Sequence, residues 1–142
     1  MPILGIDYGA KKIGLAISGS NDKVALPLKT LLSNNQSEVF EQLRLICQDN
    51  AVKKIIIGVP LSLSNGQKAF LRRQDLQNKQ MQEVLNFVKV LRKNLSLPIE
   101  LEDERLSTKL ALRASKEFVK ENGDDAIAAM LILQNYLDRV NY

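Results

Sequence analysis

Hydrophobic residues in the first part of the chain form short runs, a pattern that predicts strands buried in a sheet. Residues 3–7 are apolar without alternation until Asp7, as expected of a central strand covered on both faces. Residues 13–18 alternate large and small side chains, which fits a strand antiparallel to the first. A third strand is predicted at residues 24–30, where Pro27 indicates a sheet edge or a β-bulge.

The hydrophobic pattern then changes to a helical period. A helix capped by Ser37 is predicted up to about residue 50, with an apolar stripe that includes Cys47. We therefore expect Cys47 to be a buried structural thiol rather than a nucleophile. A buried strand is predicted at residues 54–59, and a long helix is predicted at about residues 68–95.

The remaining sequence predicts one more strand and two helices. The strand is expected at residues 98–102, a helix capped by Ser107 follows, and the last helix is expected at about residues 124–140. This order predicts an α/β fold: a mixed five-stranded sheet, three antiparallel strands then parallel strands, with helices on both faces. No repeat or linker suggests a second domain, so residues 1–142 are expected to form a single domain.

Composition restricts the chemistry that the chain can perform. It contains no histidine and a single cysteine, which excludes Ser-His-Asp and Cys-His catalysis, histidine metal ligands and multi-cysteine zinc sites. A net charge of +4 suits a nucleic-acid or phosphate partner without demanding one. Because we find neither a signal peptide nor a run long enough to span a bilayer, we expect a cytoplasmic protein with no membrane partner.

Three acids stand at the ends of predicted elements: Asp7 ends the first strand, Glu104 follows the fifth, and Asp125 opens the last helix. The carboxyl ends of neighbouring parallel strands share one edge of a sheet, where ligands tend to bind. Carboxylates that converge there repel one another unless cations are present, and their oxygens suit Mg²⁺ or Mn²⁺. Such ions activate water without a histidine, so the pattern indicates metal-dependent chemistry on a phosphodiester.

Each of these acids also has an ordinary structural explanation. Asp7 suits an Asx turn at Tyr8-Gly9, and either Asp124 or Asp125 suits a helix N-cap. Glu104 suits a surface ion pair with its neighbour Arg105. The pattern of residues alone leaves these alternatives open.

Motifs in four parts of the chain occur in the same order in a known family. They are Asp7-Tyr8-Gly9 with Lys11, Lys12 and Gly14; Ile57-Gly58-Val59-Pro60 with Asn65-Gly66; Asp103-Glu104-Arg105-Leu106-Ser107-Thr108; and Asp125 with Ala128-Ala129 and Ile132-Leu133-Gln134. On these motifs the chain resembles the YqgF (RuvX) family over essentially its whole length.

The resemblance implies an RNase H-like fold and a nuclease that matures the 5′ end of pre-16S rRNA, with a Holliday junction resolvase as the alternative. It implies Asp7, Glu104 and Asp125 as the catalytic, metal-binding positions. We expect Mg²⁺ or Mn²⁺ as the cofactor. The expected partner is structured RNA, or branched DNA, bound by a monomer or weak homodimer.

Three basic residues are the expected phosphate contacts: Lys11, Lys12 and Arg105. The chain departs from the family at Ala10, where members often carry a hydroxyl residue. It also departs before Asp125, where a segment that is often basic is nearly balanced in charge. These departures keep open a different class of function, a nucleic-acid-binding assembly factor with a vestigial site.

Overall fold

The computed structural model describes residues 2–19, 21–59, 77–103 and 124–141. The strands are β1 (Ile3–Tyr8), β2 (Lys12–Ser18), β3 (Ala25–Leu32), β4 (Lys54–Val59) and β5 (Ile99–Asp103). The helices are α1 (Gln36–Asp49), α3 (Gln77–Asn94) and α6 (Asp124–Val140). None of the helices in these ranges is both long enough and apolar enough to cross a membrane.

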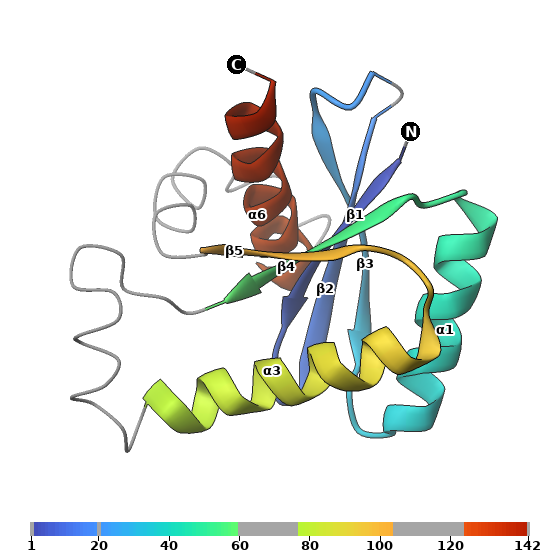
Figure 1. Ribbon diagram of the computed structural model, residues 1–142, viewed down its shortest axis with the longest axis vertical. Coiled ribbons are helices and arrows are strands. Elements are labelled where there is room, and N and C mark those ends of the chain that lie inside the picture. Colours follow the sequence, from blue (N-terminus) through green and yellow to red (C-terminus); the bar gives the residue numbers. More distant parts are fainter. Residues whose placement is uncertain (1, 20, 60–76, 104–123, 142) are drawn as a thin grey trace.

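The strands form one five-stranded sheet in the order β3-β2-β1-β4-β5 (Figure 1). β1 lies at the centre, antiparallel to β2 and parallel to β4, and β5 is parallel to β4. The predicted mixed sheet is therefore confirmed. Pro27 lies in the edge strand β3, and the ladder with β2 changes register there, so the predicted bulge is also confirmed.

Helices cover both faces of the sheet, as predicted (Figure 1). α1 and α3 pack on one face, where Leu4 and Ile6 of β1 are fully buried. α6 packs on the other face through small and aliphatic side chains that include Ala129 and Leu133. Burying a large aliphatic side chain contributes about 1.5–3 kcal/mol, so these two cores hold the sheet between its helical layers.

Cys47 lies on the buried face of α1 and is part of the core, as its helical spacing predicts. Burial raises the pKa of its thiol to about 11. Because the thiolate is the reactive form, this cysteine is a structural residue, in agreement with the prediction.

The predicted N-cap of α1 is wrong. The helix begins at Gln36, and Asn35 is its cap, with Oδ1 accepting a hydrogen bond from the Glu38 backbone N at 3.2 Å. Ser37 lies inside the first turn instead. Asn and Ser are about equally good caps, so local preference does not decide between two such residues this close together.

Two predicted segments fall outside the described ranges. They are the part of the long helix before residue 77 and the helix expected after Ser107. The described part of the long helix is α3, and its buried face includes Met81, Val84 and Leu91.

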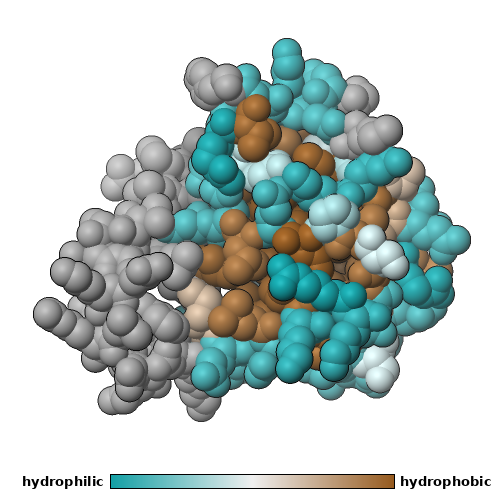
Figure 2. Space-filling model, in the orientation of Figure 1, coloured by the Kyte–Doolittle hydropathy of each residue, from teal (hydrophilic) through white to brown (hydrophobic). Residues whose placement is uncertain are grey.

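A hydrophobic area remains visible on the side of the sheet that carries α3. Figure 2 shows apolar side chains gathered in the middle of this face, with hydrophilic ones around them. Leu85 of α3 and Leu101 of β5 are among the exposed large hydrophobic residues of the protein.

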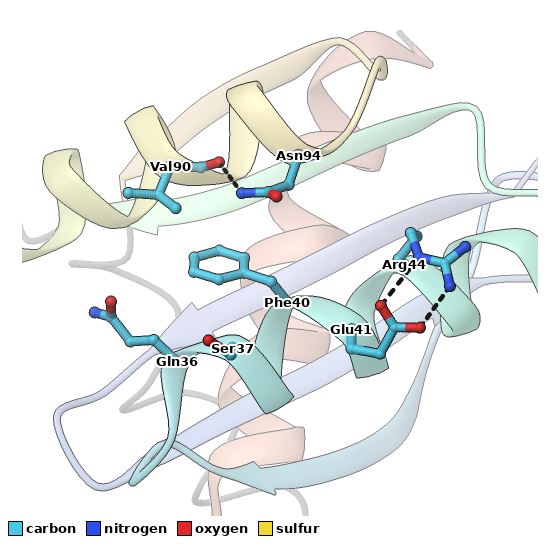
Figure 3. Close-up of a pocket in the computed structure, with 7 residues that line it drawn as sticks. All are labelled: Gln36, Ser37, Phe40, Glu41, Arg44, Val90 and Asn94. Atoms are coloured by element: carbon cyan, nitrogen blue, oxygen red, sulfur yellow. Dashed lines mark hydrogen bonds and ion pairs between the residues drawn. The ribbon is translucent and has the colours of Figure 1, made fainter.

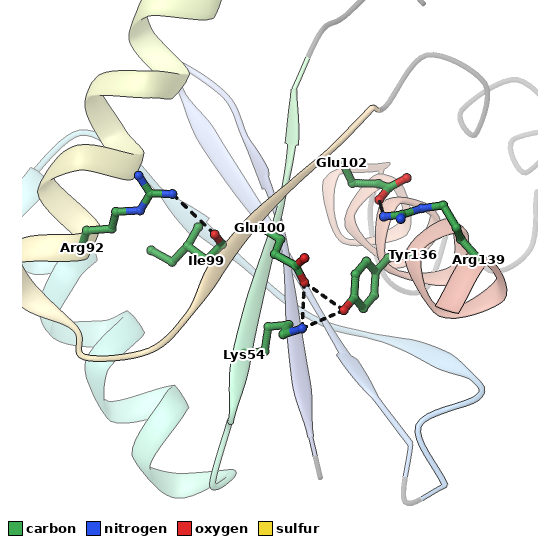
Figure 4. A network of polar contacts seen from close by, with 7 residues as sticks. All are labelled: Lys54, Arg92, Ile99, Glu100, Glu102, Tyr136 and Arg139. Atoms are coloured by element: carbon green, nitrogen blue, oxygen red, sulfur yellow. Dashed lines mark hydrogen bonds and ion pairs between the residues drawn. The ribbon is translucent and has the colours of Figure 1, made fainter. Parts of the chain in front are cut away.

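A polar network joins β4, β5 and α6 around Tyr136 (Figure 4). The Tyr136 hydroxyl accepts a hydrogen bond from Lys54 Nζ at 2.9 Å and donates one to Glu100 Oε2 at 2.9 Å. Lys54 Nζ also lies 2.8 Å from Glu100 Oε2, and these contacts lower the pKa of the Glu100 carboxyl. Arg139 lies over the same ring and pairs with Glu102. The network therefore fastens the edge strand β5 to α6.

Replacing Tyr136 by phenylalanine is expected to lower the free energy of unfolding by about 1 kcal/mol, because the ring stays packed while Lys54 and Glu100 lose a buried partner. Urea unfolding at neutral pH measures this change. The contact depends on ionised Glu100, whose pKa is lowered in the folded state. The difference between the variant and the wild type should therefore shrink as the pH falls below the ordinary carboxyl value of 4.5.

Tyr8→Phe is the matched control for this prediction. The Tyr8 ring packs on Phe87 with centroids 4.5 Å apart, and that contact does not need the hydroxyl. Equal losses of stability in the two variants would contradict a specific role for the Tyr136 hydroxyl.

Candidate active site

Asp7 lies near the end of β1, on the face of the sheet that α6 covers. Leu4 and Ile6 point to the opposite face, where they are buried under α1 and α3. Gly5 faces α6, because a Cβ built there would lie 2.8 Å from Leu133 Cβ. Alternate residues of a strand share a face, so Asp7 lies on the same side as Gly5. Asp7 is only partly buried.

Gly14 allows the first turn of α6 to approach Asp7. It is the partner of Asp7 in the ladder between β1 and β2. A Cβ on Gly14 would overlap the backbone carbonyl of Asp125, so the main chain of Asp125 passes directly over this glycine. Residues that face each other in an antiparallel ladder have Cα atoms about 4.5–5.5 Å apart. Two of the three predicted acids, from opposite ends of the chain, are therefore neighbours in space.

The third predicted acid, Glu104, and the predicted phosphate contact Arg105 lie outside the described residues. β5 ends at Asp103, which pairs with Val59 of β4. Because β1, β4 and β5 are parallel, their carboxyl ends share the edge of the sheet at which Asp7 lies.

Lys11 and Lys12 are the other predicted phosphate contacts; Lys11 lies in the connection after β1, and Lys12 is the first residue of β2. Both are exposed. Lys12 and Gly14 are alternate residues of β2, so Lys12 lies on the same side of the sheet as Asp7 and Asp125. An exposed cation beside two carboxylates gives this edge a way to attract a phosphate group.

The role of the small residues beneath α6 was not predicted from the sequence. Gly5 and Gly14 lie under the helix, and the Ala129 carbonyl would lie 3.1 Å from a Cβ on Gly5. The sequence pattern does not indicate that Gly14 would face Asp125, since that contact depends on the register of two strands and on the placement of a distant helix.

The donor atoms at this site fit a hard divalent cation. Carboxylate oxygens of Asp7 and Asp125 suit Mg²⁺ or Mn²⁺ better than soft metals, which prefer sulfur. Within the described ranges no three acidic or cysteine residues form a group that could hold a metal ion. The two neighbouring acids therefore fit part of a site for a divalent cation, and Glu104, the third predicted ligand, lies outside the described residues.

A pocket of about 320 Å³ lies elsewhere, between α1 and α3 (Figure 3). Glu41 and Arg44 of its lining pair with each other, and Asn94 Nδ2 donates to the Val90 carbonyl at 2.8 Å. The complete lining is Gln36, Ser37, Phe40, Glu41, Arg44, Val90 and Asn94. None of these is a predicted site residue, and the pocket is on the face opposite α6.

Two curated relatives are similar to the chain over almost its whole length. Both carry the name "Putative pre-16S rRNA nuclease". The protein from Rickettsia peacockii (strain Rustic) is 36% identical over 144 residues, which is 98% of this chain and 87% of the relative. The protein from Rickettsia typhi (strain ATCC VR-144 / Wilmington) is 38% identical over 144 residues, which is 98% of this chain and 86% of the relative.

Two solved structures share the fold. RuvC of T. thermophilus, in complex with a Holliday junction substrate, has a TM-score of 0.61 and 15% identity over 99% of this chain and 96% of that one. The Fowlpox virus resolvase, in complex with Holliday junction DNA, has a TM-score of 0.59 and 12% identity over 100% of both chains. These similarities confirm the expected RNase H-like fold. The profile of the RuvX family, described as Holliday junction resolvase, matches residues 1–139, and the chain therefore belongs to this family.

Proposed function

We propose that this protein is a metal-dependent nuclease that cuts phosphodiester bonds in pre-16S rRNA. The observation that carries the proposal is the contact of the Asp125 backbone with Gly14, which brings Asp125 beside Asp7 at the carboxyl edge of the sheet. Membership of the RuvX family and the names of the Rickettsia relatives support a nuclease and favour RNA as the substrate.

In this proposal Asp7, Glu104 and Asp125 hold Mg²⁺ or Mn²⁺ through their carboxylate oxygens. When bound, such an ion neutralises phosphate charge and activates the attacking water. The absence of histidine from the chain fits this assignment, because no imidazole is available as a general base.

The basic residues of the site are assigned to substrate binding. Lys11, Lys12 and Arg105 contact phosphates, which position a nucleic acid without reading its sequence. We place the reaction in the cytoplasm, on structured RNA, with the protein acting as a monomer or weak homodimer. A net charge of +4 is compatible with this kind of partner.

The second candidate function is Holliday junction resolution. The family description and the junction-bound structural neighbours favour it. A resolvase makes two symmetric cuts, so this function needs a two-fold dimer. The third candidate, an assembly factor with a vestigial site, needs RNA binding without cleavage.

Cleavage of two substrates side by side tests these candidates. One is an end-labelled RNA that contains the 5′ region of pre-16S rRNA, and the other is a four-way DNA junction, each assayed with Mn²⁺, Mg²⁺ or EDTA. We expect metal-dependent cleavage of the RNA, roughly tenfold or more faster than cleavage of the junction. Faster, symmetric cutting of the junction by a dimer would favour the resolvase. RNA binding without cleavage in any metal would contradict a nuclease.

A further inference from the structure

Ser33, the residue after β3, is hydrogen-bonded to three consecutive carbonyl groups of the turn that follows Asp7. Its backbone N donates to the Lys11 carbonyl at 3.0 Å. Its Oγ donates to the Ala10 carbonyl at 2.7 Å and to the Gly9 carbonyl at 3.2 Å. Since a hydroxyl has one proton, the bond to Ala10 is the stronger branch of a shared hydrogen bond. Ser33 therefore forms hydrogen bonds with all three peptide groups that join residues 9–12.

Because a peptide group is planar, the direction of each carbonyl also fixes the direction of the N–H group in the same peptide. The described peptides are all trans, so each N–H points away from the carbonyl of the same peptide group. The carbonyls of residues 9–11 are directed at Ser33, and the N–H groups of residues 10–12 are consequently directed away from it. Backbone N–H groups on the outer side of a turn carry positive partial charge, which attracts an anion.

The turn is tight, so the hydrogen bonds from Ser33 stabilise one restricted backbone conformation. A Cβ on Gly9 would lie 2.6 Å from the Lys12 carbonyl, so only glycine fits there without a shift. Ala10 has no polar side-chain atom with which to stabilise the turn. The hydroxyl of this turn comes from Ser33 instead, at a separation of 23 residues from Ala10.

We propose that Ser33 is a positioning residue for the substrate phosphate. It holds the turn of residues 9–12 so that its N–H groups and the cations of Lys11 and Lys12 face a phosphate next to Asp7. This inference rests on the proposed nuclease function and identifies what orders its phosphate contacts. Removing the hydroxyl should weaken substrate binding more than turnover, because Asp7 is held by its own ladder with Gly14.

The test uses variants that remove or keep the hydroxyl. Ser33→Ala removes it, and the pair Ser33→Thr and Ser33→Val compares a hydroxyl with a methyl group of the same size. Ser96→Ala is the matched control, because Ser96 is exposed in the connection before β5, at the opposite end of the parallel strands. Thermal unfolding establishes that each variant is folded.

Three measurements follow on each variant. Hydrogen exchange of residues 10–12 in the free protein reports the order of the turn. Fluorescence anisotropy in EDTA gives the Kd for the pre-16S RNA fragment and for the DNA junction, and steady-state cleavage of the RNA gives kcat and KM. In Ser33→Ala and Ser33→Val we expect the hydrogen-exchange rate of residues 10–12, the Kd and the KM each to rise roughly fivefold to tenfold. The kcat should change by less than about twofold. Ser33→Thr and Ser96→Ala should match the wild type.

Other outcomes separate this inference from the proposed function. If the wild type binds RNA and never cleaves it, the nuclease assignment is wrong. The hydrogen-exchange rate of residues 10–12 and the Kd for RNA still test the role of Ser33 in that case. Unchanged exchange in Ser33→Val overturns the inference. Faster exchange with unchanged Kd also overturns it, since the turn would then be irrelevant to substrate. A wild type that binds neither nucleic acid defeats both.

Discussion

Replacing Gly14 by alanine is expected to lower the free energy of unfolding by about 2–3 kcal/mol, because the new methyl group overlaps main-chain atoms of Asp125. The neighbour is backbone, so it cannot move aside as a flexible side chain would. The first turn of α6 must shift away from the sheet. Since Gly14 is the ladder partner of Asp7, the shift separates the two acids. A displacement of about 1 Å can cost about 100-fold in rate, so cleavage should fall by at least this factor.

Gly19→Ala is the matched control for this variant. A Cβ on Gly19 would lie 3.5 Å from the Val24 carbonyl, which is an ordinary van der Waals contact. We expect its free energy of unfolding to stay within about 0.5 kcal/mol of the wild type and its activity to be retained. Urea unfolding and metal-dependent cleavage measure both properties. Equal behaviour of the two glycine variants would show that α6 does not depend on Gly14 for its position.

The sheet could be predicted from the sequence because burial on both faces leaves a clear pattern. Ile55 and Ile57 face α1 and α3, Ile56 faces α6, and all three are 0% exposed. Such a strand is a continuous apolar run, which is distinct from the alternation of a half-exposed strand. The edge position of β3 was also predictable, because proline removes a donor from the ladder and is tolerated there.

The start of α1 could not be predicted at the level of the residue. The choice between Asn35 and Ser37 depends on which side-chain oxygen reaches a backbone amide three residues later, and both residues are good caps. This difference does not affect the packing of the helix, because its apolar stripe is set by the spacing of Val39, Phe40 and Leu43.

The candidate site could be predicted in part. Asp7 and Asp125 could be named because acids at the ends of buried elements need cations or strong donors. The contact that brings them together could not, because it joins Gly14 of a strand to the backbone of a distant helix. Ser33 could not be identified from the sequence for the same reason. Its hydrogen bond to Gly9 spans 24 residues, whereas the periodicity of hydrophobic residues reports only local structure. The sequence thus supplies the candidate acids, and the fold adds the residues that lie around them.

Asp7→Asn is expected to lower the rate of metal-dependent cleavage by about 1,000-fold or more, which corresponds to about 4 kcal/mol of transition-state stabilisation. Asparagine keeps the size of the side chain and loses the negative charge that attracts a divalent cation. A second readout follows from linkage between binding and folding. An ion present at 100 times its Kd stabilises the folded state by about 2.7 kcal/mol. Mn²⁺ should therefore raise the melting temperature of the wild type and should raise that of the variant much less.

Asp49→Asn controls for the loss of a charge. Asp49 is exposed at the end of α1, which leads into the start of β4 and thus lies at the opposite edge of the sheet from Asp7. This variant should keep both its cleavage rate and its response to Mn²⁺. Wild-type cleavage by Asp7→Asn would show that the chemistry lies elsewhere in the protein. An inactive Asp7→Asn that still gains full thermal stability from Mn²⁺ would show that the ion is held by other carboxylates. Asp7 would then act on the substrate rather than on the metal.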